Sequence, residues 1–208
     1  MNPKDFGTKE IERLRKLGVT NLDAHIAYLL IEGVPQAYHP TEGAIAMAAA
    51  CGRSSHEGSI IRAFHKDRYN IDNMFIVGCD SREIPPEHQD YDLHLSYVNG
   101  DVRFADSWEG GLISAREDKR KYDFVLINFP PLMVKMDPWP DIIRRGLQFL
   151  SEEGVIAVTG MDADLPHLST LQDILSESEE IALTPVQNFR YVGRSVTNYG
   201  LLSIQKNH

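Results

Sequence analysis

The chain has 208 residues, of which 42% are hydrophobic and 25% are charged, and its formal net charge is -9. This length suits one hydrophobic core and leaves no room for a second full catalytic domain. No apolar run approaches the roughly 20 residues that a membrane span needs, and the first residues lack the apolar stretch of a signal peptide. We therefore expect a cytoplasmic protein without membrane contacts.

Charge and cysteine usage exclude several classes of site. The acidic balance argues against an extensive nucleic-acid surface, because such surfaces neutralise phosphates with Lys and Arg. Cys51 and Cys79 stand far apart in the sequence, which indicates neither a disulfide framework nor a zinc site. His56-Glu57 is not followed by a second histidine at the helical spacing of zinc hydrolases. We expect no metal site. The sequence is compatible with a homo-oligomer.

The first 40 residues show helical periodicity. Apolar positions predict helices over residues 8–17 and 21–32, and Gly18 and Gly33 follow them as stop signals. We assign residues 1–40 to an N-terminal helical extension and residues 41–208 to the main domain.

Residues 43–50 are rich in alanine and allow three interpretations. They form the first strand of a sheet, or the first helix of a helix-turn-helix over residues 44–64, or part of a helix that begins at residues 38–42. Alanine favours a helix over a strand. A further helix over residues 57–68 and a short buried strand over 74–77, which leads into Asp80, follow in all three cases.

The rest of the chain alternates strands and helices. Residues 93–98 and 102–108, joined by Asn99-Gly100, predict a hairpin. The run 124–127 is typical of a parallel strand covered on both faces. After it we expect a helix over 139–150, a strand over 155–158, a helix over 167–177, and closing strands over 188–192 and 199–204. This order predicts a parallel sheet with an antiparallel pair at its end.

The second half resembles Rossmann-like S-adenosylmethionine-dependent methyltransferases. The likeness rests on a strand that ends in Asn128-Phe129-Pro130-Pro131, on Leu-Ser-Glu-Glu-Gly before a buried strand at residues 150–158, and on the closing strand at 198–206. The resemblance implies an α/β fold of the Rossmann-like methyltransferase type, with a mostly parallel twisted sheet, an antiparallel C-terminal strand pair and helices on both faces.

The resemblance also implies site residues after the strand at 124–127. In amino-methylating members, Asn followed by Pro-Pro and an aromatic residue holds the target amine by acceptor groups, so rate comes from positioning. The matching positions are catalytic Asn128, Pro130 and Pro131, with Phe129 and Leu132 against the substrate. Phe129 is an insertion and Leu132 replaces the aromatic residue, and both departures weaken the implication of a planar amine.

The cofactor loop resembles a degenerate version of the family's glycine loop. The chain contains no Gly-x-Gly, and the matching stretch is residues 50–60. Asp80 resembles the acceptor for the ribose hydroxyls, Asp106 resembles the acceptor for the adenine amino group, and Trp108 is a stacking partner. The implied residues for S-adenosylmethionine are Cys51, Gly52, Gly58, Asp80, Asp106, Ser107 and Trp108.

Two functions follow from the sequence. The first is an S-adenosylmethionine-dependent methyltransferase whose acceptor is unknown, with an amino group among the candidates. The second is a methyltransferase-like protein without activity that serves as a binding or scaffolding module, including one associated with nucleic acid.

Overall fold

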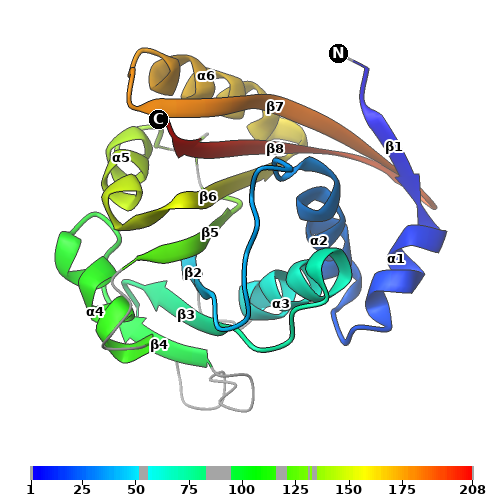
Figure 1. Cartoon of the computed structure of the whole chain (residues 1–208). Helices are drawn as coiled ribbons and strands as arrows, with labels where there is room; N and C mark the ends of the chain where they lie inside the picture. The colour runs from blue at the N-terminus through cyan, green and yellow to red at the C-terminus, as the bar shows by residue number, and fades with distance from the viewer. Residues whose placement is uncertain are drawn as a thin grey trace.

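The computed structural model describes residues 2–51, 56–82, 95–115, 121–130, 132 and 135–207. In this part of the chain eight strands form one sheet, and helices cover both of its faces (Figure 1). The strands are β1 (Lys4–Gly7), β2 (Ile45–Ala49), β3 (Phe75–Asp80), β4 (Leu95–Asn99), β5 (Tyr122–Asn128), β6 (Leu150–Met161), β7 (Ile181–Val192) and β8 (Val196–Lys206). The helices are α1 (Thr8–Arg15), α2 (Asn21–Gly33), α3 (His56–Tyr69), α4 (Ala105–Ala115), α5 (Trp139–Phe149), the short 3-10 helix η3 (Asp162–Asp164) and α6 (Leu165–Ser176).

The strand order is β1-β7-β8-β6-β5-β2-β3-β4. Strands β2 to β6 run parallel, while β8 is antiparallel to both β6 and β7. The order reverses at β2, since β3 and β4 continue on one side of it and β5 and β6 on the other. The predicted parallel sheet with an antiparallel C-terminal pair is confirmed.

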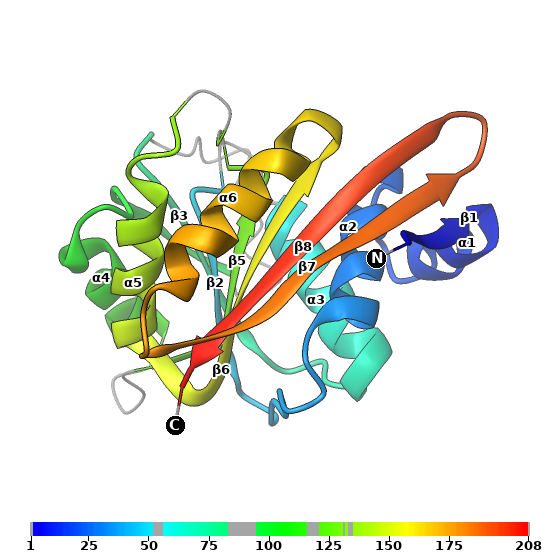
Figure 2. The same cartoon turned by 90° about the horizontal axis from the view of Figure 1, so that it is seen from above.

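The helices form two layers, with α2 and α3 over one face of the sheet and α4, α5 and α6 over the other (Figure 2). The first layer buries Leu29, Leu30 and Phe64 against Phe124. The second layer buries side chains such as Trp108 against the opposite face. Each layer removes apolar area from water, which supplies most of the stabilisation of such a fold.

The alanine-rich segment is the central strand β2, not a helix. Ala46 and Ala48 face the core beneath α2 and α3, while Ile45, Met47 and Ala49 face the opposite core. All five are buried. Burial on both faces outweighs the weak strand propensity of alanine, because propensity is a weak prior that tertiary context overrides. The helix-turn-helix and the long helix from residues 38–42 are therefore wrong.

The predicted hairpin over residues 93–108 is also wrong. Leu95–Asn99 pairs in parallel with β3, and Asn99-Gly100 leads directly into a turn and then α4. Gly100 donates its N–H to the carbonyl of Asp80 at 2.9 Å, and a Cβ on Gly100 would lie 2.4 Å from Oγ of Ser107. The glycine therefore serves the close approach of α4 to the strand end.

The helices predicted over the first 40 residues are confirmed as α1 and α2, and a short strand precedes them. In β1, Lys4 to Gly7 pair in parallel with Phe189 to Val192 of β7. The start of the chain thus covers the edge of the C-terminal strand pair (Figure 1). Among the described helices, none is both long and apolar enough to cross a membrane.

Candidate functional site

The carboxyl ends of the five parallel strands meet at one edge of the sheet. Register places Ala49 beside Cys79, Asp80 beside Asn99, and Asn128 beside Thr159. In open α/β sheets, ligands bind in the crevice at this edge where the strand order reverses. The reversal lies between β2 and β5, so this edge is the candidate site.

Two residues that follow these strand ends adopt the left-handed backbone conformation. Ala50 after β2 has φ of 56°, and Phe129 after β5 has φ of 48°. This region costs a non-glycine residue on the order of 1 to 3 kcal/mol, and such strain concentrates at ligand sites. The two strained residues flank the reversal point, which supports a functional assignment for this edge.

The cofactor loop predicted from the sequence begins at this point. Cys51 is buried and donates its N–H to the carbonyl of Cys79 at 3.1 Å, so the loop leaves β2 alongside β3. Burial, followed by the nearby charges of Glu57 and Asp80, raises the pKa of the Cys51 thiol, which stays protonated. Gly58 is buried in the first turn of α3. Gly52 lies outside the described residues.

Asp80 closes β3 with its side chain 6% exposed. Its Oδ1 accepts the backbone N–H of Arg82 at 2.9 Å and the Nε–H of the same residue at 3.0 Å. The Arg82 side chain is 57% exposed, whereas the Asp80 carboxylate is buried at the end of the strand. A ligand hydroxyl at this position would share the Asp80 carboxylate with Arg82 or displace the arginine.

The three residues predicted at the start of α4 do not line this edge together. Trp108 is fully buried, its Nε1–H donates to the carbonyl of Val102 at 2.9 Å, and it stacks on Phe149. Ser107 is buried and donates to the carbonyl of Asp101 at 2.9 Å. Asp106 is exposed on the first turn of α4. Trp108 is thus a core residue, unable to stack on a ligand in this position.

Asp101 is an acid near this edge that was not among the residues expected from the sequence. It follows the end of β4 by two residues, next to Asp80 through the pairing of Asp80 with Asn99. Hydrogen bonds from Arg103 lower the pKa of the Asp101 carboxyl and keep it ionised. An acid two residues after Asn99, the last residue of β4, could have indicated this position, but Asn99-Gly100 also fits a hairpin turn.

Asn128 lies at the end of β5 with both ends of its amide engaged. Its Oδ1 accepts a hydrogen bond from the Thr159 hydroxyl at 2.7 Å, and its Nδ2 donates to Oε1 of Glu57 over a long 3.4 Å. Phe129 packs against the core under α2 and α3. Pro130 is buried, as is Leu132 in the opposite core, and Pro131 lies outside the described residues.

A polar cluster from the N-termini of α2 and α3 adjoins Asn128. Burial, more than any other cause, raises the pKa of Glu57 to about 7, and the hydrogen bond from Asn128 opposes the shift. His56 lies 3.2 Å from Oδ2 of Asp23, which is buried at the first turn of α2. Asp23, Glu57 and Thr159 were not predicted from the sequence, because only the folded chain brings α2, α3 and β6 together.

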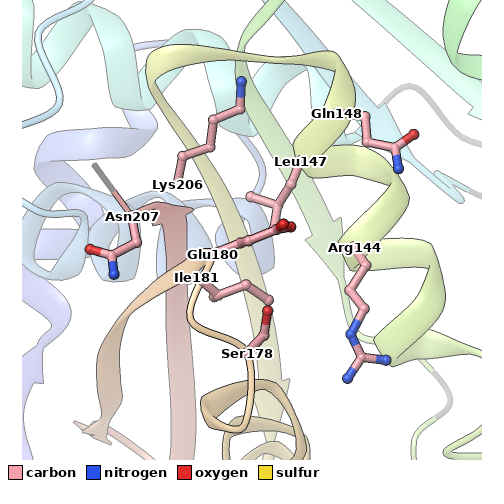
Figure 3. A pocket seen from close by; sticks show the side chains of 8 residues that line it. All are labelled: Arg144, Leu147, Gln148, Ser178, Glu180, Ile181, Lys206 and Asn207. Carbon is pink, nitrogen blue, oxygen red and sulfur yellow. The ribbon is translucent and has the colours of Figure 1, made fainter.

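A hollow of about 430 Å³ lies at the other end of the sheet (Figure 3). Its walls include Arg144 of α5, Glu180 before β7, and Lys206 at the end of β8. It is therefore far along the strands from the carboxyl ends that carry Asp80 and Asn128. Within the described ranges, no group of three or more His, Cys, Asp or Glu side chains is placed to hold a metal ion.

No sequence-family model matches the chain, and a search of curated proteins finds no relative. Solved structures do match it. A TehB-like S-adenosylmethionine-dependent methyltransferase from Corynebacterium glutamicum matches with a TM-score of 0.54 and 13% identity, over 94% of this chain and 95% of the other. Precorrin-6y C5,15-methyltransferase from Geobacter metallireducens matches with a TM-score of 0.53 and 11% identity, over 88% and 89%.

A third structure is 1,6-didemethyltoxoflavin-N1-methyltransferase from Burkholderia thailandensis, which was crystallised with 1,6-didemethyltoxoflavin and S-adenosylhomocysteine. It matches with a TM-score of 0.52 and 14% identity, over 99% of this chain and 94% of the other. At these identities the likeness is one of fold. The chain has the Rossmann-like fold of S-adenosylmethionine-dependent methyltransferases.

Proposed function

We propose that this protein is an S-adenosylmethionine-dependent methyltransferase, with its cofactor over the carboxyl ends of β2, β3 and β4 and its acceptor beside Asn128. The observation that carries the proposal is a pair of carboxylates, Asp80 at the end of β3 and Asp101 two residues after the end of the adjacent β4. A fold alone does not imply an activity, so the assignment rests on these side chains.

The side chains at this edge fit the chemical groups of the cofactor. A ribose carries two neighbouring hydroxyl donors, and the buried Asp80 carboxylate is a rigid acceptor for them. Asp101 is a second ionised acceptor within reach of the adjoining strand end. The backbone at Ala50 has the left-handed conformation, and this residue carries only a methyl side chain.

When bound, the cofactor would supply an electrophilic methyl group on a sulfonium centre. The chain's own residues would then bind and orient the acceptor, since methyl transfer depends mainly on alignment. Asn128 is held in one orientation by Thr159, which removes rotamer freedom before the acceptor arrives. Met161, two residues beyond Thr159 at the end of β6, is 40% exposed.

Calorimetry with S-adenosylmethionine and S-adenosylhomocysteine tests the proposal. We expect the wild-type protein to bind both, and Asp80→Ala to weaken binding by about 1 to 3 kcal/mol, because it strands the ligand hydroxyls that the carboxylate accepts. Asp141→Ala is the control, since Asp141 is exposed on α5 and pairs only at the surface with Arg144. Folded wild-type protein that binds neither ligand at millimolar concentration would contradict the proposal.

A second pair of variants distinguishes the two acids near β4. Asp101→Ala should weaken S-adenosylhomocysteine binding, whereas Asp106→Ala should leave it unchanged, because only Asp101 lies next to the end of β4. The opposite ranking would show that the acid on α4, expected from the sequence, is the one that contacts the ligand.

A further inference from the structure

The acceptor side of the crevice contains a carboxylate whose second oxygen has no assigned role. Oε1 of Glu57 accepts from Asn128, whereas Oε2 is buried and has no hydrogen-bond partner among the residues that the structure describes. A buried acceptor without a partner costs about 1 to 3 kcal/mol, so each one in a native protein calls for an explanation. The simplest explanation at this position is that a bound ligand donates a hydrogen bond to Oε2.

The side-chain amide of Asn128 is already engaged in two hydrogen bonds. Its Oδ1 already receives the hydroxyl of Thr159 at 2.7 Å, and its Nδ2 points at Glu57. A donor group beside Asn128 would also meet the carboxylate of Glu57, whose Oε2 makes no hydrogen bond to a described residue. Glu57 stands on the first turn of α3, which begins shortly after β2, so it faces the same reversal point.

The charge around Glu57 favours a cation. Asp23 contributes a second carboxylate close enough to raise the pKa of Glu57, and it is buried with a hydrogen bond of 2.8 Å from the Thr20 hydroxyl. The imidazole of His56 is largely exposed, and its Nδ1 lies 3.2 Å from Oδ2 of Asp23. Two neighbouring carboxylates in a partly buried site attract positive charge and repel anions.

Resting on the proposed function, we propose that the acceptor is a basic amine and that Glu57 binds its ammonium form and takes a proton from it. One N–H bond of the ammonium breaks, the proton passes to Oε2 of Glu57, and the electron pair of that bond stays on nitrogen. The neutral amine and the protonated carboxyl are the products of this step. The freed lone pair is what an amine needs before it accepts a methyl group.

The environment of Glu57 suits this step. Burial raises the pKa of Glu57 to about 7 and so makes its carboxylate more basic than an ordinary one, which offsets part of the lowering that a bound ammonium causes. Asn128 keeps the carboxylate aimed at the end of β5, where the acceptor is expected. Because Glu57 must be ionised to accept a proton, its contribution should grow as the pH rises through about 7.

A titration in the absence of cofactor tests the site by itself. The carboxyl carbon of Glu57 is followed by NMR in protein labelled at glutamate and assigned by its loss in Glu57→Gln. Methylamine, benzylamine and putrescine are the probes, and benzyl alcohol is the neutral control. We expect the amines to lower the titration midpoint by about 1 to 3 pH units, because a cation nearby favours the ionised carboxylate. An unchanged midpoint with every amine would overturn the inference.

Methyl transfer to the same amines supplies the second readout. Glu57→Gln keeps the shape of the side chain and should lower the rate about 100-fold, in the range of a lost proton acceptor. Its affinity for S-adenosylhomocysteine should stay within about twofold of wild type, and Glu57→Asp should recover part of the rate. Glu177→Gln, exposed at the end of α6, is the matched control.

The two hypotheses fail in different ways. Wild-type protein that binds S-adenosylhomocysteine but methylates phenols or thiols instead of amines would overturn the inference and leave the proposed function standing. Protein that does not bind S-adenosylhomocysteine would overturn the proposed function, whatever the amine titration shows. An equal rate in Glu57→Gln and wild type would remove Glu57 from the proton transfer.

Discussion

Burial shifts the pKa values of the fully buried His65 and the partly buried Glu57 in opposite directions. His65 is fully buried between α3 and the sheet, with Nδ1 2.7 Å from the carbonyl of Ile61 and Nε2 2.7 Å from the hydroxyl of Tyr38. A carbonyl only accepts, so Nδ1 carries the proton and Nε2 accepts from Tyr38. Burial lowers the pKa of His65 to about 4, whereas burial raises the pKa of Glu57 to about 7.

The two shifted pKa values make stability depend on pH in opposite directions. Between pH 6.5 and 4 the unfolded chain protonates His65 and the folded chain does not, so His65 makes the protein less stable as the pH falls. Between pH 4.5 and 7 the unfolded chain ionises Glu57 and the folded chain does not, so Glu57 makes the protein less stable as the pH rises. Across pH 4.5 to 6.5 the two effects offset each other.

Single variants should separate the two opposing pH dependences of the free energy of unfolding. Relative to wild type, Glu57→Gln should gain stability as the pH rises from 4.5 to 7, by about 3 kcal/mol over the window. Relative to wild type, His65→Gln should gain stability as the pH falls from 6.5 to 4, by a similar amount. Urea unfolding at several pH values measures both differences, and differences that do not vary with pH would contradict the assigned burial.

At the scale of single elements, helix α4 contains two adjacent glycines in different surroundings. A Cβ on Gly110 would lie 3.7 Å from Val98, an ordinary contact. A Cβ on Gly111 would lie 2.2 Å from the hydroxyl oxygen of Tyr122, which is fully buried and donates to the carbonyl of Trp108 at 2.8 Å. Only Gly111 is therefore required for α4 to approach the sheet.

Alanine substitutions at these two positions should have opposite effects. Gly110→Ala should stabilise the protein by up to about 1 kcal/mol, the difference in helix propensity between the two residues. Gly111→Ala gains the same propensity but displaces a buried, hydrogen-bonded tyrosine, so we expect a net loss of about 1 to 2 kcal/mol. Thermal and urea unfolding measure both, and equal shifts in the two variants would mean that the helix does not pack as described.

The elements also show how far the sequence predicts the structure. Strands β5, β6 and β8 follow from short runs of apolar residues, and helices α5 and α6 follow from apolar residues at helical spacing. The segments β2 and β4 do not. The alanines of β2 pack closely on both faces of the sheet, although alanine favours a helix. Asn99-Gly100 at the end of β4 fits both a hairpin turn and a turn that leads into a helix.

The candidate site was predictable only in part. Asp80 and Asn128 end strands that the sequence predicts, so both could be placed at the candidate edge. The loop after β2 uses left-handed Ala50, a position that the sequence pattern would expect to be glycine, so its signal is weak. Glu57 and Asp23 come together only through the packing of α2 on α3, which no local pattern reports.

For the molecule as a whole, strand β1 at the start of the chain pairs with strand β7 near its end. Phe6 of β1 is 4% exposed and stacks on Tyr28 of α2 with ring centroids 4.5 Å apart. It also contacts Tyr191 of β7 and Tyr199 of β8. Asp5 pairs with Arg190, and β1 covers the backbone edge of β7, which an exposed strand would otherwise offer to other chains. We propose that residues 1–40 fold in one cooperative unit with the remainder.

A single substitution distinguishes such a unit from a separately docked segment. Phe6→Ala removes a fully packed aromatic ring and should lower the global free energy of unfolding by about 3 to 5 kcal/mol. The fluorescence of Trp108 and Trp139 reports this change from the opposite face of the sheet, far from Phe6. Leu22→Ala, at a residue 49% exposed on α2, is the control and should change stability by under about 0.5 kcal/mol. If the N-terminal segment only docks, tryptophan fluorescence would show an unchanged transition while amide exchange in β1 accelerated.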